Sequence, residues 1–582
     1  MCTDDSVIHT HDHGHDNGHK NDQDHAHNKP TGHVHGTGGD TTSGATDLAI
    51  ADGDLSDSAR SRRRFLQSVG LLGLGATTGA LGIATQAAAQ SATTNDSGYQ
   101  WLAGDHHIHT QYSSDGLYTV GQHVGNAKQY GIDWMVITDH GAVAHEKVSV
   151  GRTNADVVRA RNDFPNMLVF QGLEWNIPGA EHGTIFVPPS NDEVFFLNLF
   201  EYTFDGAIVR PDNPKENSEF MERKAQDGLR WLAEQVRTKR LAAALFLANH
   251  PARRGVDSPH EIRGWSDAAP GIAVGMEGAP GHQAAGIAKS ALGPEQARGF
   301  YDNTPTIDSF PLYPLESYRT YGGFDWMTAK VGGLWDSLLA EGRRWWITAN
   351  SDSHSVYKDT FMRGDGNGKY ADPTSAFFGK YGDPVRVGSP VAGNGDYWAG
   401  FYSKTLVGAV SRNYLAVMAA ISAGRMWVMH GDLIRALDMR VSGSKSVDGG
   451  VTLGGNFSAK VGEDVVVTIK IRLADKANNN GDTPVLSRVD LISGEITGPT
   501  KDRDSFAAPA AVVKSFDIKQ KGGEVTLTYT FGSVKSSFYV RIRGTDGRFA
   551  ATGTIEPRLD PVPIDPWTDL WFYANPIFVG VS

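Results

Sequence analysis

Histidines and acidic side chains occur in short groups in the middle of the chain, at spacings that suit metal binding. Residues 105–109 read Asp-His-His-Ile-His, and residues 352–354 read Asp-Ser-His. In an extended segment side chains alternate between two faces, so His107 and His109 point the same way, and the same geometry pairs Asp352 with His354. Imidazole nitrogens and carboxylate oxygens are common ligands of divalent metal ions. Each pair can therefore hold one ion.

Further groups of the same kind follow along the chain. They are Thr138-Asp139-His140-Gly141, Gly172-Leu173-Glu174-Trp175, Glu181-His182-Gly183, Asn249-His250-Pro251 and Glu277-Gly278. One such histidine alone is ordinary, because most histidines in strands and loops form hydrogen bonds at the surface or in the core. The chain has 21 histidines, but nine lie within residues 9–35, which leaves 12 in the remainder. Because so few histidines remain, the presence of a histidine or an acidic residue in nearly every group indicates a metal site.

Short apolar segments accompany these groups, and longer amphipathic stretches separate them. We predict strands over 107–109, 134–138, 167–173, 184–187, 243–248, 272–276 and 345–349. Intervening helices, such as 120–130 and 222–238, then predict a parallel α/β fold. Seven such units favour a barrel, in which the carboxyl ends of the strands converge on one mouth. The ligand groups lie at those ends.

Taken in order, these motifs resemble those of the PHP (polymerase and histidinol phosphatase) superfamily of metallohydrolases. The residues that carry the resemblance are Asp105-x-His107-x-His109-Thr110, Ser114-Asp115-Gly116, Thr138-Asp139-His140-Gly141, Glu174, His182, His250 and Asp352-x-His354. Two further stretches, Tyr402-Ser403-Lys404-Thr405 with residues 420–425 and Ala574-Asn575-Pro576-Ile577, resemble the secreted carbaryl-hydrolase-like branch. The resemblance implies a distorted seven-stranded (β/α)7 barrel over residues 100–435, with two or three divalent ions (Zn, Mn or Fe) at its mouth.

The resemblance also implies how the ligands divide among the ions. One ion would be held by His107, His109, Glu174 and Asp352. A second would be held by Asp115, His140 and His354, and a third by Glu174, His182 and His250. Glu174 would then bridge two ions. Some members have histidine where this chain has Asp115, so the second site is expected to be richer in oxygen here.

Several neighbouring residues are candidates for supporting or catalytic roles. Asp139 is expected to orient an imidazole, and His250 or His354 to pass a proton to the leaving group. Arg253 and Arg254 follow His250 closely, and guanidinium groups match phosphate oxygens, although a solvated loop is an equal alternative. The remaining histidines are expected to be structural: His106, His123, His145, His260, His282 and His430. His282, which follows Glu277, is also a candidate for the lining of the pocket.

Hydrolysis of an ester without a protein nucleophile is the expected reaction. Metal ions lower the pKa of a water and polarise the substrate oxygen, so hydroxide attacks near neutral pH. The only cysteine is Cys2, and the chain has no Gly-x-Ser-x-Gly sequence. Phosphate mono- or diesters are the favoured small-molecule or anionic substrates, and carboxylic or carbamic esters are the alternative. A non-catalytic metal-binding cell-surface protein is less favoured because the ligand set is complete. An amidohydrolase-type barrel lacks its expected lysine at a strand end.

The N-terminal 89 residues have a different character. Residues 1–60 form a low-complexity tract with nine histidines and no apolar periodicity, so we predict disorder. Residues 61–89 resemble a twin-arginine signal, because Ser61-Arg62-Arg63-Arg64-Phe65-Leu66-Gln67 precedes an apolar run and Ala87-Ala88-Ala89. The run is short and rich in Gly and Thr, so cleavage is favoured over a permanent membrane anchor. We therefore expect the twin-arginine export machinery as a partner and a periplasmic or secreted protein.

After residue 435 the pattern changes to alternating strands without helices. We predict strands over 464–473, 487–492, 512–518, 524–531 and 537–543. They predict an antiparallel β-sandwich over residues 436–582. Aromatic side chains near the end, including Trp567 and Trp571, need a surface to cover them, which favours packing against the barrel. The formal net charge of −12 argues against a nucleic-acid partner.

Overall fold

The computed structural model describes residues 99–582 apart from positions 114, 142, 210–217, 288–295, 302, 364–384, 446–448 and 548–564. The predicted His-rich tract, the predicted signal segment and Ser114 lie outside the described residues. None of the helices in the described ranges is both long enough and apolar enough to cross a membrane.

Seven strands between residues 100 and 349 lie side by side in one sheet. In spatial order they are β1 (Gln100–Asp105), β2 (Trp134–Ile137), β3 (Leu168–Asn176), β4 (His182–Val187), β5 (Leu245–Ala248), β6 (Ala273–Ala279) and β9 (Trp346–Ala349). The pairs β1–β2, β2–β3, β5–β6 and β6–β9 are parallel. This part of the molecule is therefore a mixed α/β fold around a sheet with parallel strands.

The prediction of an all-parallel sheet is wrong at one strand. β4 pairs antiparallel with both β3 and β5. Only residues 177–181 connect β3 to β4, whereas a crossover between parallel strands needs a dozen or more residues. The short connection reverses the chain, so the first residue of β4, His182, lies at the edge of the sheet where β3 ends.

The predicted strand at 107–109 is displaced, because β1 ends at Asp105 and the histidines follow it. The buried Asp105 carboxylate accepts hydrogen bonds from the backbone N–H groups of His107 and Ser351, which follow β1 and β9. Ile108 also forms a parallel bridge with Ser353. The two edges of the seven-strand run thus meet beyond their carboxyl ends. No backbone ladder joins β1 to β9 among the described strands, so a closed barrel is not resolved.

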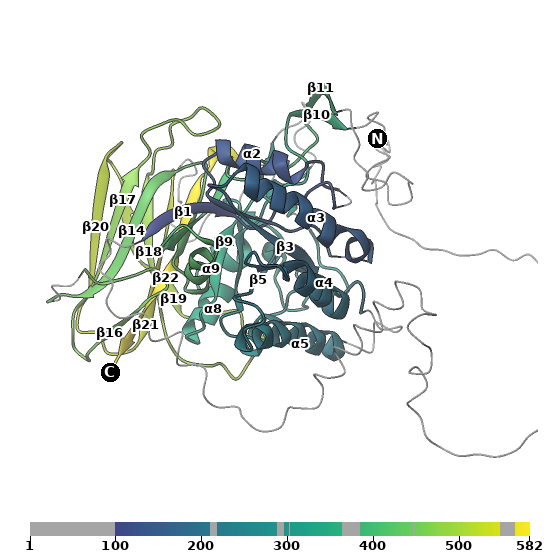
Figure 1. The fold of residues 1–582 in the computed structure, drawn as a ribbon. Coiled ribbons are helices and arrows are strands. Elements are labelled where there is room, and N and C mark those ends of the chain that lie inside the picture. The colour runs from purple at the N-terminus through teal and green to yellow at the C-terminus, as the bar shows by residue number, and fades with distance from the viewer. Residues whose placement is uncertain are drawn as a thin grey trace, which may run out of the picture. The chain divides into compact units, whose positions relative to one another are not determined.

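Helices pack around this part of the molecule (Figure 1). They are α2 (Val120–Gln129), α3 (Val143–Asp163), α4 (Glu193–Phe204), α5 (Ser218–Arg237), α6 (Pro259–Ala268), α7 (Trp326–Ala329), α8 (Leu334–Ala340) and α9 (Tyr414–Ser422). The predicted helices at 120–130 and 222–238 correspond to α2 and α5. Capping boxes formed by Thr119 with Gln122 and by Ser258 with Glu261 start α2 and α6. Buried aromatic residues, including Trp175 of β3, fill the core between helices and sheet.

Antiparallel strands extend the same sheet beyond β1. They are β12 (Ser403–Ala409), β13 (Met426–His430), β22 (Trp571–Val581), β21 (Phe538–Thr545), β18 (Arg488–Glu495) and β19 (Ala510–Asp517). β16 (Asn456–Ala459) pairs in parallel with the C-terminal part of β22, residues 578–581. Because β22 lies between β13 and β21, the C-terminal aromatic residues are buried, and Tyr573 is fully covered.

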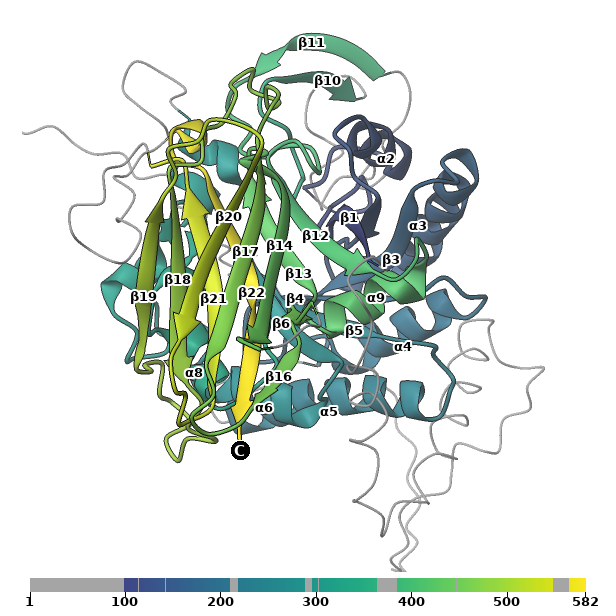
Figure 2. The same cartoon turned by 90° about the vertical axis from the view of Figure 1, so that its left-hand side faces the viewer.

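A second antiparallel sheet covers this extension. Its strands are β15 (Val451–Thr452), β14 (Ile434–Gly443), β17 (Val465–Leu473) and β20 (Glu524–Phe531). The two sheets share one apolar core, to which Met439 and Ile469 contribute from one sheet and Leu491 and Ile542 from the other. Figures 1 and 2 show β14, β17 and β20 as the outer layer of this antiparallel part. The predicted strands from 464 to 543 correspond to β17–β21, and the boundary at residue 436 stays a prediction.

Two small hairpins complete the described elements. β7 (Thr320–Tyr321) pairs with β8 (Phe324–Asp325), and β10 (Asp359–Arg363) pairs with β11 (Val385–Val391). Short 3-10 turns are η4 (Gln283–Gly286), η5 (Arg298–Phe300), η6 (Leu315–Tyr318) and η7 (Pro566–Thr568).

Candidate metal centre

The predicted metal-ligating side chains lie together at the edge of the sheet where β3 ends. They come from segments after β1, β2, β5 and β9, from β3 and from the first residue of β4: His107, His109, Asp115, His140, Glu174, His182, His250, Asp352 and His354. Residues up to 247 positions apart in the sequence thus form one connected cluster. The fold brings together the whole predicted set.

Glu174 stands at the centre of this cluster and is almost fully buried. Its Oε1 lies 3.1 Å from His107 Nε2, 3.1 Å from His182 Nδ1 and 3.3 Å from His250 Nε2. Its Oε2 lies 2.6 Å from His140 Nδ1 and 3.5 Å from His109 Nε2. Burial alone would raise the pKa of Glu174, but the surrounding imidazoles, led by His182 and His107, hold it well below its usual value. The carboxylate is therefore ionised and in contact with five imidazole rings.

Asp352 faces Glu174 across the imidazoles of His107 and His109. Its Oδ1 lies 3.1 Å from His107 Nε2 and 3.3 Å from His109 Nε2. The two Nε2 atoms are themselves 2.9 Å apart. Burial would raise the pKa of Asp352, but His107, His282 and His354 keep it well below its usual value. Two buried carboxylates and two imidazoles thus converge on one point.

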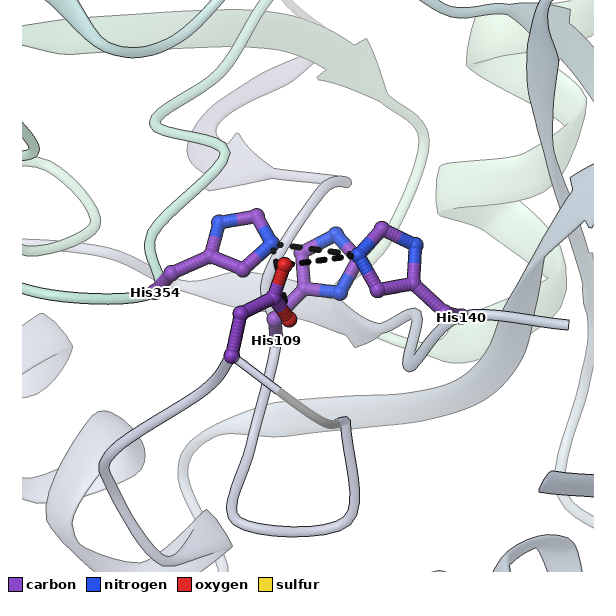
Figure 3. A group of neighbouring side chains, drawn as sticks. His109, His140 and His354 are labelled. Atoms are coloured by element: carbon purple, nitrogen blue, oxygen red, sulfur yellow. Dashed lines mark hydrogen bonds and ion pairs between the residues drawn. The ribbon is translucent and has the colours of Figure 1, made fainter. Parts of the chain in front are cut away.

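A second group lies on the more exposed side of the centre. His140 Nε2 lies 3.2 Å from Asp115 Oδ2 and 3.4 Å from His354 Nε2, and His354 Nε2 lies 3.6 Å from Asp115 Oδ1. Figure 3 shows the rings of His109, His140 and His354 turned toward one another. The Asp115 side chain is 55% exposed, whereas the Glu174 and Asp352 side chains are at most 3% exposed. The centre is therefore open to solvent at the Asp115 side.

The spacing of these atoms fits bound divalent ions. Two atoms that each lie about 2.0–2.2 Å from one ion are about 2.8–3.6 Å apart at tetrahedral or octahedral angles. The contacts within each of the three predicted ligand sets fall between 2.9 and 3.6 Å. In addition, Glu174 Oε2, His182 Nδ1 and Asp352 Oδ1 are buried without a hydrogen bond of good geometry. A bound cation would satisfy these atoms, and the groups of His, Asp and Glu at this edge are consistent with more than one metal ion.

Supporting residues orient several of the imidazoles. The buried Glu277 carboxylate, at the end of β6, lies 2.6 Å from His107 Nδ1 and accepts a hydrogen bond from the His250 backbone N–H. His107 consequently presents Nε2 to Glu174 and Asp352, an arrangement common around metal-binding histidines. Glu277 was recognisable as an acidic residue after a strand, but its partner could not be read from the sequence.

Asp139 supports the loop that carries His109. It accepts hydrogen bonds from Thr110 N (2.6 Å), Thr110 Oγ1 (2.8 Å) and Ser113 Oγ (3.0 Å), while Ser113 Oγ also lies 3.0 Å from His109 Nδ1. The carboxylate therefore acts on His109 through Ser113. Among the hydrogen bonds of the described residues, none joins Asp139 to the His140 ring.

Arg253 and Arg254 share a single carboxylate partner. Arg253 Nη2 lies 3.4 Å from Glu181 Oε2, and Arg254 Nε lies 3.6 Å from Glu181 Oε1. Glu181 Oε2 is also 4.0 Å from His250 Nδ1. Burial would lower the pKa of Arg253, but Glu181 and then Asp352 raise it. The Arg253 guanidinium therefore interacts electrostatically with carboxylates of the centre, whereas the Arg254 side chain is half-exposed.

The histidines outside the motifs have diverse surroundings. His106 is buried between Thr184 and Thr348. His123, on α2, contacts the carbonyl oxygen of His109. His260 lies between Glu222 and Asp504, and His430 packs on Tyr402 and Phe324. His282 contacts Asp352, so it adjoins the centre. The His145 side chain lies outside the described residues.

The comparison with protein families identifies the segment that carries most of these ligands. Residues 105–184 match the family described as PHP domain. This segment is similar to that family. The match runs from β1 to β4 and contains His107, His109, His140, Glu174 and His182. His250, Asp352 and His354 lie outside the matched segment, and the fold brings them to the same cluster.

No curated protein matches the sequence. Among solved structures, a two-domain protein containing a predicted PHP-like metal-dependent phosphoesterase from Bacteroides vulgatus is 15% identical, with a TM-score of 0.31. That match covers 80% of this chain and 95% of the other. A chitin-binding domain from Burkholderia pseudomallei is 8% identical, with a TM-score of 0.13 and coverage of 22% and 57%. A β-glucosidase from Listeria innocua is 10% identical, with a TM-score of 0.14 and coverage of 39% and 22%. At these TM-scores none of the three informs the function of this chain.

Proposed function

We propose that this protein is a metal-dependent hydrolase of phosphate mono- or diesters. The observation that carries the proposal is the buried Glu174 carboxylate, which contacts five imidazoles while one of its oxygens lacks a hydrogen bond. A purely structural carboxylate would be satisfied by hydrogen-bond donors. A set of buried, incompletely satisfied ligand atoms favours metal binding over a scaffold role.

Each ligand set has a distinct part in the proposal. His107, His109, Glu174 and Asp352 would hold the most buried ion. Asp115, His140 and His354 would hold a second, and Glu174, His182 and His250 a third. Bound divalent ions, with Zn, Mn and Fe as candidates, would supply Lewis-acid polarisation of the ester and an acidified water. The carboxylates of Glu174, Asp352 and Asp115 would balance the charge of the ions.

The chain's own groups limit which histidine can transfer a proton. His354 Nδ1 lies 2.9 Å from the carbonyl oxygen of Asp352 and so donates to the backbone. His250 Nδ1 instead has no hydrogen bond and faces Glu181 at 4.0 Å. Of the two histidines, only His250 therefore has an Nδ1 that is not bonded to the backbone, and the Glu181 carboxylate lies beside it.

Arg253 supports a preference for anionic esters. Its guanidinium is mostly buried beside His250 and the Glu181 carboxylate. One carboxylate faces two guanidinium groups, which leaves positive charge available for phosphate oxygens. The counter-argument is that both arginines already have an ionic partner, and this favours a carboxylic or carbamic ester as the alternative substrate.

The wider proposal rests on the sequence motifs. We propose that the seven strands β1–β6 and β9 form a distorted barrel, in which the Ile108–Ser353 bridge is the closing contact. We also propose that the chain belongs to the secreted carbaryl-hydrolase-like branch and is exported by the twin-arginine machinery to the periplasm or the medium. Replacement of Arg62 and Arg63 by lysine should then leave unprocessed protein inside the cell, and normal processing of this variant would contradict the export proposal.

Metal analysis combined with an ester panel tests the proposed function. Protein purified from the periplasm or medium should contain two or three divalent ions per chain and should hydrolyse phosphate esters faster than matched carboxylic esters. A faster rate on carboxylic or carbamic esters would favour the alternative. Protein without bound metal, and without activity after addition of Zn²⁺ or Mn²⁺, would contradict the proposal.

A further inference from the structure

His282 contacts the candidate centre from outside the predicted ligand sets. Its Nε2 lies 2.7 Å from Asp352 Oδ2, and its Nδ1 lies 2.5 Å from Asp396 Oδ1. All three side chains are buried. Asp352 contacts His107 and His109 through its other oxygen, Oδ1. Asp396, His282 and Asp352 therefore form a continuous chain of contacts. It ends on Asp352 Oδ2, the oxygen that does not contact His107 or His109.

The distances distinguish a hydrogen bond from shared metal ligation. Atoms bound to one ion are about 2.8–3.6 Å apart, because each lies about 2.0–2.2 Å from the ion. The contacts of Asp352 Oδ1, at 3.1 and 3.3 Å, fall in this range. The contact of His282 with Asp352 is an ion pair at 2.7 Å, shorter than this range. His282, Asp352 and His354 lie close enough together to form a candidate metal group of their own. Both ring nitrogens of His282 already face carboxylates, however, which favours an orienting role.

Asp396 connects the same chain to a further ligand. Its Oδ2 accepts hydrogen bonds from the backbone N–H groups of His354 (2.6 Å) and Ser355 (2.7 Å). The Asp396 backbone is also fixed, because its N–H donates to Ser355 O and its carbonyl accepts from Tyr357 N. One aspartate outside the predicted set thus contacts both His282 and the segment that presents His354.

The backbone of this region is strained at two of the residues in contact. His282 has φ 55° and Asp352 has φ 45°, both in the left-handed region that side chains other than glycine rarely adopt. Each such residue costs about 1–3 kcal/mol and persists only where its surroundings determine it. Here the His282 carbonyl accepts from Ala285 and Gly299, and its N–H donates to Ser351. Because this strain is kept at two residues that contact each other, the surrounding structure constrains how their side chains are placed.

We propose that His282 and Asp396 are positioning residues of the metal centre. They hold Asp352 through Oδ2, so that Oδ1 is the oxygen presented with His107 and His109, and they fix the backbone at His354. The inference rests on the proposed function only in taking Asp352 and His354 as ligands. It adds two residues, neither of them a ligand, that determine how tightly the ions are held.

Metal titration of purified, metal-free protein tests the proposal. His282→Ala should bind as many Zn²⁺ or Mn²⁺ ions at saturation as the wild type, but with affinity lowered about 10- to 100-fold for at least one of them. His282→Gln keeps a donor for Asp352 and should lose less affinity. The matched control is His260→Ala, because His260 also lies between two carboxylates, Glu222 and Asp504, but on α6 and outside the ligand cluster. This control should bind metal like the wild type.

Each outcome of the titration either supports or overturns the proposal. Unchanged affinity in folded His282→Ala would overturn the proposal. One ion fewer at saturation would also overturn it, because His282 would then be a ligand. If His282→Ala does not fold, Asp396→Asn serves in its place and should likewise weaken binding without changing the number of ions. Failure of the wild type to bind any divalent ion would instead contradict the proposed function.

Discussion

Two of the regions that bury charged side chains differ in how the charges are satisfied. At the contact between α8 and β21, Asp336 accepts hydrogen bonds from Arg541 Nε (2.8 Å), Arg541 Nη2 (2.7 Å) and Tyr539 Oη (2.9 Å). At the candidate metal centre, Glu174 and Asp352 are surrounded by imidazoles, and each has one oxygen without a hydrogen bond of good geometry. The Asp336 carboxylate is satisfied by groups of the protein itself, whereas the incompletely paired carboxylates and imidazoles of the centre are suited to bind a cation.

The largest effect should come from Glu174→Gln, which keeps the size of the side chain but removes its charge. Because Glu174 is the proposed bridge between two ions, its loss should lower the metal content and reduce turnover by several orders of magnitude. Metal per mole and phosphatase and esterase rates measure this. A fully loaded and active Glu174→Gln protein would show that the centre has been misinterpreted.

Asp336→Ala should instead lower the stability of the fold and leave metal binding unchanged. Removal of one partner from a buried ion pair leaves Arg541 uncompensated, so the free energy of unfolding should fall by about 3–5 kcal/mol. Metal affinity of the remaining folded protein should not change. Denaturant unfolding measures the first quantity and metal titration the second. Asp227→Ala, which removes an exposed partner of Arg230, is the control and should cost less than about 1 kcal/mol.

Removal of metal should sharpen the contrast between the two regions. Ions that bind only the folded protein stabilise it by about 2.7 kcal/mol when the free ion is at 100 times its Kd. A chelator should therefore lower the Tm of the wild type and of Asp336→Ala, but lower the Tm of Glu174→Gln much less. Thermal unfolding with and without the chelator checks this, and an equal shift in all three proteins would contradict it.

The smallest effect concerns substrate charge. Simultaneous Arg253→Ala and Arg254→Ala should raise KM for a phosphate ester about tenfold, as expected for the loss of one charge-assisted contact worth about 1.5 kcal/mol. KM for a neutral carboxylic ester should change less. Steady-state kinetics on both substrates compare them, and equal changes would mean that the pair is only a surface loop.

Local spacing made most of the centre predictable. The pairs His107 with His109 and Asp352 with His354 are two residues apart, a spacing that places both side chains of a pair on one face of an extended segment. Both pairs do come together in the structure, although they follow β1 and β9 and Asp352 has φ 45°. The direction of β4 was not predicted, because apolar periodicity carries no direction. Asp396 was missed for a different reason, since its contact with His282 spans 114 residues and depends on the path of the chain before β12.

The strand β22 has a consequence for the timing of folding. It lies between β13 and β21, and its Asn575 side chain accepts a hydrogen bond from Ile347 N and donates one to Ile347 O in β9. Asp352 and His354 follow β9 directly. During synthesis from the N-terminus, residue 575 leaves the ribosome more than two hundred residues after Ile347. We therefore expect the centre to acquire its final geometry, and its ions, only after translation has passed residue 575.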